Sequence, residues 1–302
     1  MYAIECHELT KYYGRNRGII DVDLAIEQGE IFGFIGPNGA GKSTTIKTLL
    51  NFVYPTSGSA SILGHDCVHE SKDIKRIVGY VPPEVAYYDF MTVSELLNFS
   101  ARFYRVETNS RGHELAKVFD LPLQQRIDSL STGNKKKIAI VQAVLHQPQV
   151  LILDEPTSGL DPLMQQRLFE LLLHENSRGV TIFFSSHVLS DVQKVCERVG
   201  IIREGRVIQI EEVRRLREKQ LKRVTIEFSQ SNGHEVMQAS LRTICELPGV
   251  VQHELNGNEL QLLYGEKPRR LLQVLAELEI ENLTVEEPSL EEVFMHYYEK
   301  EA

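Results

Sequence analysis

The sequence has no excess of positive charge, no paired cysteine motif and no long hydrophobic run. Its 33 Lys and Arg residues against 42 Asp and Glu residues give a net charge of −9, which argues against nucleic-acid binding because that interaction requires a basic face. The four cysteines, at positions 6, 67, 196 and 245, form no Cys-x-x-Cys motif, so neither a zinc site nor a disulfide framework is expected. No apolar run approaches the roughly 18–20 residues of a membrane-spanning helix. We therefore expect a cytoplasmic chain without a nucleic-acid partner, and any membrane span must come from another chain.

The order of apolar patterns predicts an α/β domain in the larger, N-terminal part of the chain. Alternation in residues 2–9 and 21–26 predicts antiparallel strands, and short continuous apolar runs further on predict buried parallel strands. Segments with helical spacing lie between these runs, which is the arrangement of a parallel sheet with crossover helices. A mostly helical insertion is predicted at about residues 88–147.

The pattern starts afresh after a charged stretch, residues 211–223, which we interpret as a solvated connector helix. Beyond it the order β-α-β-β-α-β predicts a small α+β domain of the ferredoxin-like type. We place the domain boundary between residues 213 and 214, so that residues 214–302 hold the connector helix and the accessory domain.

A glycine-rich loop lies between a predicted buried strand, Ile31–Ile35, and a predicted helix that begins near Lys42. Residues 36–43 read Gly-Pro-Asn-Gly-Ala-Gly-Lys-Ser. The glycines let backbone N–H groups approach phosphate oxygens, and the helix N-terminus adds donors and a favourable dipole. Lys42 suits the β and γ phosphates, and the Ser43 hydroxyl suits Mg²⁺. A plain strand–turn–helix connection is the alternative, but the flanking elements favour a nucleoside triphosphate site.

A second motif joins a buried strand to two carboxylates. Apolar residues 150–153 are followed directly by Asp154 and Glu155, which a parallel sheet delivers to its carboxyl edge, where ligands of such folds bind. Asp154 would hold Mg²⁺ directly or through its water, and Glu155 would polarise a water for attack on the γ phosphate. An acidic pair after a strand is also typical of a helix start. The phosphate loop upstream favours the catalytic interpretation.

Four motifs occur in the order found in ATP-binding cassette (ABC) ATPases. Besides residues 36–43, they are Leu-Ser-Thr-Gly-Asn at 130–134, Leu-Asp-Glu-Pro-Thr-Ser-Gly-Leu-Asp-Pro at 153–162 and Ser-His at 186–187. Residues 1–209 therefore resemble this family. The resemblance implies a phosphate-loop NTPase with a RecA-like core, an antiparallel β subdomain and a helical subdomain, and it implies ATP and Mg²⁺ as ligands.

The resemblance also assigns roles to individual residues. It makes Glu155 and His187 catalytic, with His187 as a switch that contacts the γ phosphate and orders the attacking water. The expected Mg²⁺ ligands are Ser43 and Asp154, and Glu84 is a candidate third ligand at a place where the chain departs from the family pattern. The implied nucleotide-binding residues are Tyr13, Gly36, Asn38, Gly39, Ala40, Gly41, Lys42, Ser43, Thr44, Ser131, Gly133 and Asp161.

For three of these assignments the resemblance also implies a specific contact or place. Tyr13 matches the aromatic residue that stacks on adenine, although Tyr12 or Tyr13 could instead pack on the antiparallel sheet. Ser131 and Gly133 match the signature loop, which contacts the γ phosphate bound by the opposite subunit of a head-to-tail dimer. Asp161 resembles the acidic residue of the loop that crosses that interface.

The chain departs from the family pattern at two places. In the signature loop, Thr132 and Asn134 replace the usual Gly and Gln. After the run Gly-Tyr-Val-Pro at 79–82, Pro83 stands where the family commonly has a Gln that touches Mg²⁺ and the water, and proline has no polar side chain. Glu84 is a candidate replacement one residue further on, and an exposed loop carboxylate is the alternative.

These motifs favour the ATPase subunit of a transporter, which acts through a separate membrane-spanning permease as a homodimer or a heterodimer with a sister ATPase. The tail, Glu-Pro-Ser-Leu-Glu-Glu-Val-Phe at 287–294, resembles that of ATPases serving multidrug, antibiotic, lipid or sodium exporters, and implies export at the cytoplasmic face of the membrane. A soluble non-transport ABC ATPase and a catalytically weak scaffold remain as alternatives. GTP selectivity is not supported, because Lys137 replaces the Asp of an Asn-Lys-x-Asp motif.

Overall fold

The computed structural model describes residues 1–87, 90–106, 110–218, 221–228, 241–276, 278–286 and 288. The chain forms two compact units, Met1–Val213 and Arg214–Ala302. Each unit has its own hydrophobic cluster, so we describe them separately.

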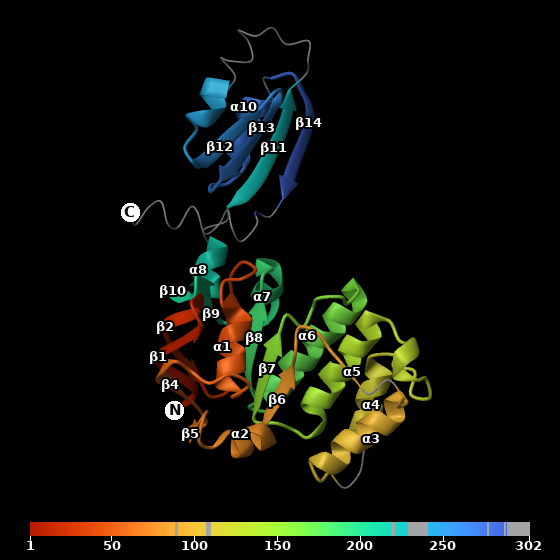
Figure 1. The fold of residues 1–302 in the computed structure, drawn as a ribbon. Coiled ribbons are helices and arrows are strands. Elements are labelled where there is room, and N and C mark those ends of the chain that lie inside the picture. The colour runs from red at the N-terminus through yellow and green to blue at the C-terminus, as the bar shows by residue number, and fades with distance from the viewer. Residues whose placement is uncertain are drawn as a thin grey trace. The chain divides into compact units, whose positions relative to one another are not determined.

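The larger unit is built around a six-stranded sheet with the strand order β10-β9-β3-β8-β7-β6 (Figure 1). Its strands are β3 (Ile31–Ile35), β6 (Val78–Val81), β7 (Val150–Asp154), β8 (Thr181–Ser186), β9 (Arg198–Arg203) and β10 (Arg206–Glu212). All are parallel to their neighbours except β10, which pairs antiparallel with β9. Every residue of β3, β7 and β8 is buried, which accounts for the continuous apolar runs of the sequence.

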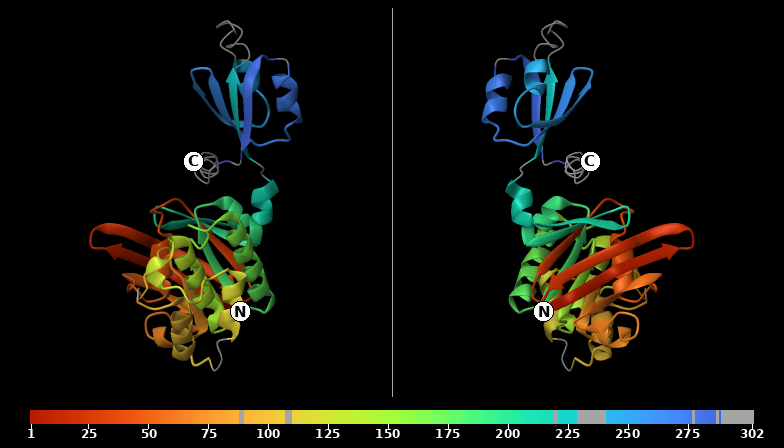
Figure 2. Two further views of the ribbon diagram at one scale, coloured as in Figure 1. Left: turned by 90° about the vertical axis from the view of Figure 1, so that its right-hand side faces the viewer. Right: turned by 90° about the vertical axis from the view of Figure 1, so that its left-hand side faces the viewer.

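A second, antiparallel sheet has the order β2-β1-β4-β5. Its strands are β1 (Tyr2–Tyr13), β2 (Asn16–Glu27), β4 (Ser57–Ile62) and β5 (His65–Asp66). Strands β1 and β2 form a long ribbon (Figure 2) and extend beyond the predicted ranges. Glu8 and Asp21 have φ of 47° and 46°, and the pairing shifts register between Cys6 and Leu9, so these irregularities interrupt the alternation that the sequence analysis relied on.

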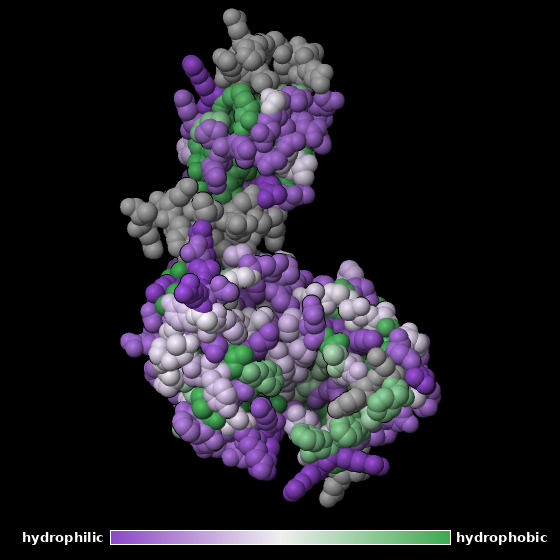
Figure 3. All heavy atoms as spheres, viewed as in Figure 1, coloured by the Kyte–Doolittle hydropathy of each residue, from purple (hydrophilic) through white to green (hydrophobic). Residues whose placement is uncertain are grey.

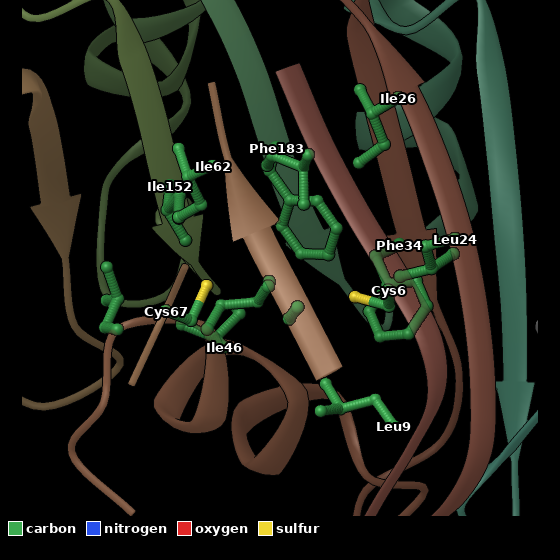
Figure 4. Close-up of a cluster of buried hydrophobic side chains, with 14 of the residues drawn as sticks. Cys6, Leu9, Leu24, Ile26, Phe34, Ile46, Ile62, Cys67, Ile152 and Phe183 are labelled. Carbon is green, nitrogen blue, oxygen red and sulfur yellow. The ribbon is translucent and has the colours of Figure 1, made fainter. Parts of the chain in front are cut away.

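Helix α1 (Lys42–Leu49) is enclosed between the two sheets. The cluster that surrounds it combines Ile4 and Ile62 of the antiparallel sheet with Phe34 and Phe183 of the six-stranded sheet (Figure 4). Ile46 of α1 is fully buried in this cluster. The helix that begins at the phosphate loop is therefore fixed from both sides.

The other helices of this part are α2 (Ser71–Ile77), α6 (Pro162–Ser177) and α7 (Leu189–Val195). Helix α7 packs closely on β3, since a Cβ placed on Gly33 would lie 2.4 Å from Val192 Cγ1. Phe169 of α6 contacts Phe184 of β8 with ring centroids 6.4 Å apart.

Three helices occupy the segment in which the sequence predicts a helical insertion: α3 (Val93–Phe103), α4 (Ser110–Val118) and α5 (Thr132–Leu145). Helix α3 begins with a capping box, in which Thr92 and Glu95 each accept a hydrogen bond from the other's backbone N–H. Helix α5 packs against β6, α3 and α4, and most of its residues are buried.

The smaller unit contains an antiparallel sheet with the order β12-β13-β11-β14. Its described elements are β11 (Lys222–Phe228), β12 (Val250–Asn256), β13 (Glu259–Tyr264), α10 (Arg269–Leu275) and β14 (Ile280–Glu286). The Asn-Gly pair 256–257, which is typical of tight hairpins, lies at the turn between β12 and β13, with Gly257 at φ 65°. The ferredoxin-like assignment stays a prediction. Of the first helix predicted there, residues 236–247, the structure describes residues from 241 onward, and 241–245 are helical. The closing helix predicted for residues 289–298 lies outside the described residues.

The connector helix predicted for residues 211–223 is present but shorter than predicted. Strand β10 continues to Glu212, α8 spans only Val213–Glu218, and β11 begins at Lys222. The reason is pairing across the β9–β10 hairpin, where Glu211 and Glu212 face Val199 and Arg198; this non-local partner outweighs the helical preference of a charged segment.

Candidate active site

The loop between β3 and α1 has the backbone conformation that its glycines predict. Gly39 and Gly41 have φ of 79° and 118°, which residues with a Cβ rarely adopt. A Cβ on Gly36 would lie 2.2 Å from the Ile202 carbonyl oxygen, so packing requires glycine there. Gly41 is the N-cap of α1 and provides no side-chain cap, so the first-turn amides of the helix remain available as donors to an anion.

The Lys42 ammonium lies inside this loop and beside a carboxylate. Its Nζ donates to the carbonyl oxygens of Gly36, at 2.6 Å, and Pro37, at 3.2 Å. It also forms an ion pair with Glu155, with Nζ 3.2 Å from Oε1. The other Glu155 oxygen, Oε2, lies 2.8 Å from His187 Nδ1. The phosphate loop and the ends of β7 and β8 thus bring together three residues that the sequence predicts as functional.

Glu155 has an unusual backbone conformation for a residue with a large side chain. Its φ is 49°, in the left-handed region that costs free energy for such residues. Its N–H donates toward the oxygens of Ser185, with Oγ at 3.2 Å and the carbonyl oxygen at 3.3 Å. These contacts hold the turn that directs Glu155 toward Lys42 and His187.

Asp154 is fully buried, with 0% of its surface exposed. The Ser185 hydroxyl donates to Oδ1 at 2.7 Å, while Oδ2 has no hydrogen-bond partner among the described residues. A buried carboxylate oxygen without a donor is uncommon and fits a cation ligand. The sequence analysis missed Ser185, although Asp154 and Ser185 are register partners at the ends of neighbouring strands.

The residues present fit Mg²⁺. Ser43 lies half-buried in the first turn of α1 and supplies a hydroxyl, and Asp154 supplies the unpaired oxygen. In the described part of the chain, no cluster of three or more His, Cys, Asp or Glu residues could hold a metal by itself. That absence is compatible with Mg²⁺, which proteins commonly bind through one or two side chains together with substrate phosphates and water.

Tyr13 is positioned on the phosphate-loop side of the antiparallel sheet. A Cβ placed on Gly18 would lie 3.2 Å from Tyr13 Cε2 and 3.0 Å from Thr44 Cγ2, so both side chains border the same glycine. The Tyr13 side chain is 43% exposed, and Lys11 Nζ lies 5.4 Å from its ring centroid. An exposed aromatic ring next to the phosphate loop agrees with the predicted stacking role.

The remaining predicted residues lie at helix starts. Ser131 is the exposed N-cap of α5, and its Oγ accepts from Asn134 N–H at 3.3 Å. Gly133 approaches the next loop closely, since a Cβ there would lie 2.8 Å from the Gly159 carbonyl oxygen. Asp161 is the N-cap of α6 and accepts from Met164 N–H at 3.0 Å. None of the hydrogen bonds described here joins Ser131, Gly133 or Asp161 to Lys42, so the structure does not bring them into the Lys42 cluster.

The loop after β6 contains Pro83, the second of the two departures from the family pattern. Pro83 is half-buried and Glu84 is exposed. The buried Lys136 of α5 donates from Nζ to the carbonyl oxygens of Pro82, at 2.8 Å, and Pro83, at 3.0 Å. Burial lowers the pKa of Lys136 to about 8, although the charges of Asp154 and Glu155 act in the opposite direction. The sequence analysis missed this residue.

Comparison with known proteins agrees with this geometry. Residues 19–158 match the family described as ABC transporter, and residues 208–298 match the C-terminal domain of DrrA1-3-like ATP-binding proteins. The linearmycin resistance ATP-binding protein LnrL of Bacillus subtilis (strain 168) is 30% identical over 303 residues, covering 97% of each chain. The bacitracin transport ATP-binding protein BcrA of Bacillus licheniformis is 34% identical over 239 residues, covering 78% of each chain.

A solved structure described as the ATP-binding subunit of an ABC transporter superposes with a TM-score of 0.66 at 31% identity, covering 71% of this chain and 92% of that one. The predicted α/β phosphate-loop NTPase fold is thereby confirmed. Among the described helices, none is both long and apolar enough to cross a membrane. The chain therefore belongs to the ABC transporter family, and it is an ATP-binding and ATP-hydrolysing subunit of such a transporter.

Proposed function

We propose that this chain powers export through a separate membrane-spanning permease, by closing on ATP as one half of a dimer. The observation that carries the proposal is the cluster of Lys42, Glu155 and His187 next to the buried Asp154. The names of LnrL and BcrA, which refer to linearmycin resistance and bacitracin transport, support export as the direction. We place the chain at the cytoplasmic face of the membrane and assign ATP hydrolysis to residues 1–213, with residues 214–302 as an accessory domain.

The loop between β3 and α1, together with the start of α1, would bind the phosphates. The N–H groups at the start of α1 and the Lys42 ammonium provide donors for the β and γ phosphates. Ser43 and Asp154 would hold Mg²⁺, which neutralises charge on the phosphates when bound. Tyr13 would stack on adenine. Asn38, Gly39, Ala40 and Thr44 complete the proposed loop contacts, and Glu84 stays a proposed Mg²⁺ ligand that its exposed position neither supports nor opposes.

Glu155 and His187 would prepare the attacking water. Glu155 is paired with Lys42, so phosphates that bind Lys42 would release a Glu155 oxygen to accept a proton from water. His187 Nδ1 contacts the other Glu155 oxygen, and as a donor this nitrogen fixes the carboxylate. In the neutral ring Nε2 then remains an acceptor for the water, whereas in the protonated ring it becomes a donor to the γ phosphate.

In a dimer, each subunit would complete the nucleotide site of the other. Ser131 and Gly133 lie at the start of α5, and we propose that they act on the nucleotide of a partner subunit. Asp161 would lie in the contact between the two subunits. We propose a head-to-tail dimer, formed by two copies of this chain or with a sister ATPase.

The permease would dock beside α3. The exposed side chains of Phe52, Phe99 and Phe103, 53%, 50% and 75% exposed, border a hollow of about 440 Å³ between α3, α5 and β6. Hydrophobic side chains gather over α3 on the face shown in Figure 3. Basic residues border an adjoining hollow, which also includes Phe103: they are Lys72, Lys75, Arg76 and Arg105. This combination fits a short amphipathic helix with acidic residues, carried by the membrane subunit.

The test is recovery of the chain with cell membranes. We expect the parent protein to co-purify with a multi-span membrane protein, and vanadate to trap ADP in the complex. Phe103→Asp should lose the membrane partner while it keeps ATP binding, because the side chain is mostly exposed and its loss leaves the core intact. Val118→Asp, which likewise replaces an exposed apolar side chain by a carboxylate, at a 45% exposed position of α4, is the control for the added charge. Isolation of the parent as a soluble ribosome complex would contradict the proposal.

A further inference from the structure

Lys136 connects helix α5 to the loop that follows β6. The residue lies in the second turn of α5 and is only 3% exposed. Its ammonium donates to two consecutive carbonyl oxygens, those of Pro82 and Pro83. A second contact joins the same segments, since Tyr87 Oη lies 3.4 Å from the Lys135 carbonyl oxygen. One cation of α5 therefore holds the backbone of a stiff Pro-Pro segment.

This connection is made at the carboxylate edge of the sheet. Val81 at the end of β6 pairs with Leu153 of the neighbouring strand β7. The residues that follow this pair, Pro82 and Asp154, therefore lie at the same edge of the sheet. The charges of Asp154 and Glu155 both act on the Lys136 ammonium. Lys136 thus faces the nucleotide side of the sheet, and not the solvent-exposed side of α5.

Packing alone does not account for a lysine at this position. A buried ammonium is costly compared with an apolar side chain of the same length, so a methionine would fill the space at lower cost. Pro83 has no polar side chain with which this loop could contact a ligand or a neighbouring element. The Lys136 hydrogen bonds are therefore the polar connection that the described residues show between α5 and residues 82–83.

We propose that Lys136 is a positioning residue for ATP hydrolysis. It fixes the loop of Pro82 and Pro83 to α5. A change in the orientation of α5, and of its N-cap Ser131, therefore also changes the arrangement of Asp154 and Glu155 at the edge of the sheet. The proposal rests on the proposed function, in which Ser131 acts across a dimer and Glu155 activates water. Lys136 touches neither nucleotide nor water in this scheme.

The experiment compares variants of the full-length chain by steady-state ATP hydrolysis and thermal melting. Lys136→Met should lower kcat by about tenfold or more, while KM for ATP stays within about twofold of the parent, because a buried charged hydrogen bond is lost without removal of a nucleotide contact. Lys136→Arg, which keeps the charge and can donate to both carbonyl oxygens, should restore most of kcat. Lys137→Met, at the half-buried next position of α5, is the matched control and should behave like the parent.

A second measurement does not depend on turnover. In a Glu155→Gln background, ATP should convert the chain to a dimer in size-exclusion chromatography. Adding Lys136→Met should reduce the dimer fraction, and Lys136→Arg should restore it. If Glu155→Gln alone neither abolishes hydrolysis nor dimerises with ATP, the proposed function fails, whatever the Lys136 variants do.

Three results would overturn the inference about Lys136 itself. One is a Lys136→Met chain with the kcat of the parent. Another is a Lys136→Arg chain as inactive as Lys136→Met at equal melting temperature. The third is a rise of KM in place of a fall of kcat. If Lys136→Met does not fold, Lys136→Gln, which removes the charge but retains a donor, replaces it and should lower kcat by a smaller factor at unchanged KM.

Discussion

Replacing Glu155 by Gln should change two properties that depend on the contact between Glu155 and Lys42: the stability of the chain without ATP and its affinity for ATP. The Lys42 side chain is 6% exposed and that of Glu155 is 14% exposed, so the variant leaves a nearly buried ammonium without its anionic partner. Lys42 keeps the carbonyl oxygens of Gly36 and Pro37, and the amide oxygen of Gln can still accept. We therefore expect a loss of only about 1 kcal/mol in the absence of ATP, less than the roughly 3–5 kcal/mol of a buried ion pair whose remaining charge has no other partner.

ATP should reverse this loss, because its phosphates replace the missing anion next to Lys42. ATP binding then recovers about 1 kcal/mol that the variant lost without ATP, so the affinity of the variant for ATP should be about fivefold higher than that of the parent. The negative charge removed from the vicinity of the phosphates acts in the same direction. Hydrolysis should fall by about 10²–10⁴-fold, the usual contribution of a general base.

The assay is thermal melting with and without ATP, at protein concentrations too low for dimer formation. For a unit of this size, about 1 kcal/mol corresponds to a melting temperature lower by about 2–4 °C without ligand, and the ATP-induced increase should be larger than in the parent. Glu170→Gln, at an exposed position of α6, has the same change of charge and serves as control. A ligand-free Glu155→Gln chain that melts at or above the parent temperature, or binds ATP more weakly, would refute the reasoning.

Three further predictions concern the neighbourhood of the site. Arg111→Met should lower the free energy of unfolding by about 2 kcal/mol in urea titrations, because Glu175 is 1% exposed and loses its 2.6 Å partner but keeps Arg178 at 3.4 Å. Tyr13→Ala should raise KM for ATP about tenfold through lost stacking, whereas Tyr13→Phe should leave it unchanged. Burial lowers the pKa of His146, so the folded state disfavours the charged ring and the free energy of unfolding should decrease as the pH falls below about 6.5. His146→Gln should remove that part of the pH dependence, measured by denaturant unfolding at several pH values.

Each of these has a clear contrary outcome. An Arg111→Met chain as stable as the parent would mean that the ion pair to Glu175 contributes nothing net. A Tyr13→Ala chain with unchanged KM would favour the alternative in which Tyr13 packs on the sheet. For His146, an unaltered pH dependence in the variant would assign the acid sensitivity to other groups.

The central part of the site could be predicted because local backbone rules determine it. Glycine is required at positions 39 and 41 by φ alone, and the burial of β7 delivers Asp154 and Glu155 to the edge of the sheet. Such features depend on a few adjacent residues. A motif of eight or ten residues therefore carries enough information to place them.

Lys136 and Ser185 were missed for two different reasons. Lys136 lies in a run of three lysines that suggests a solvated helix start, although Ile140 and Ala143, four and seven residues further on the same helix face, are buried. Helical phase could have found it. Ser185 contacts Asp154 only because β7 and β8 are neighbours in a particular register, and strand order between segments far apart in sequence is not readable from either segment alone.

The contacts at the two ends of α5 limit how the helical part of the larger unit can move. Near its start, Lys136 holds the Pro82 and Pro83 carbonyl oxygens; near its end, the Val144 carbonyl oxygen accepts from Arg111, which also pairs with Glu175 of α6. These two attachments are separated by about two turns of helix, or ~12 Å. A body held at two points on one axis can rotate about that axis, but it cannot translate or tilt away without breaking one attachment. Ser131, the N-cap of α5, is thus connected through this one helix both to the loop after β6 and to α6.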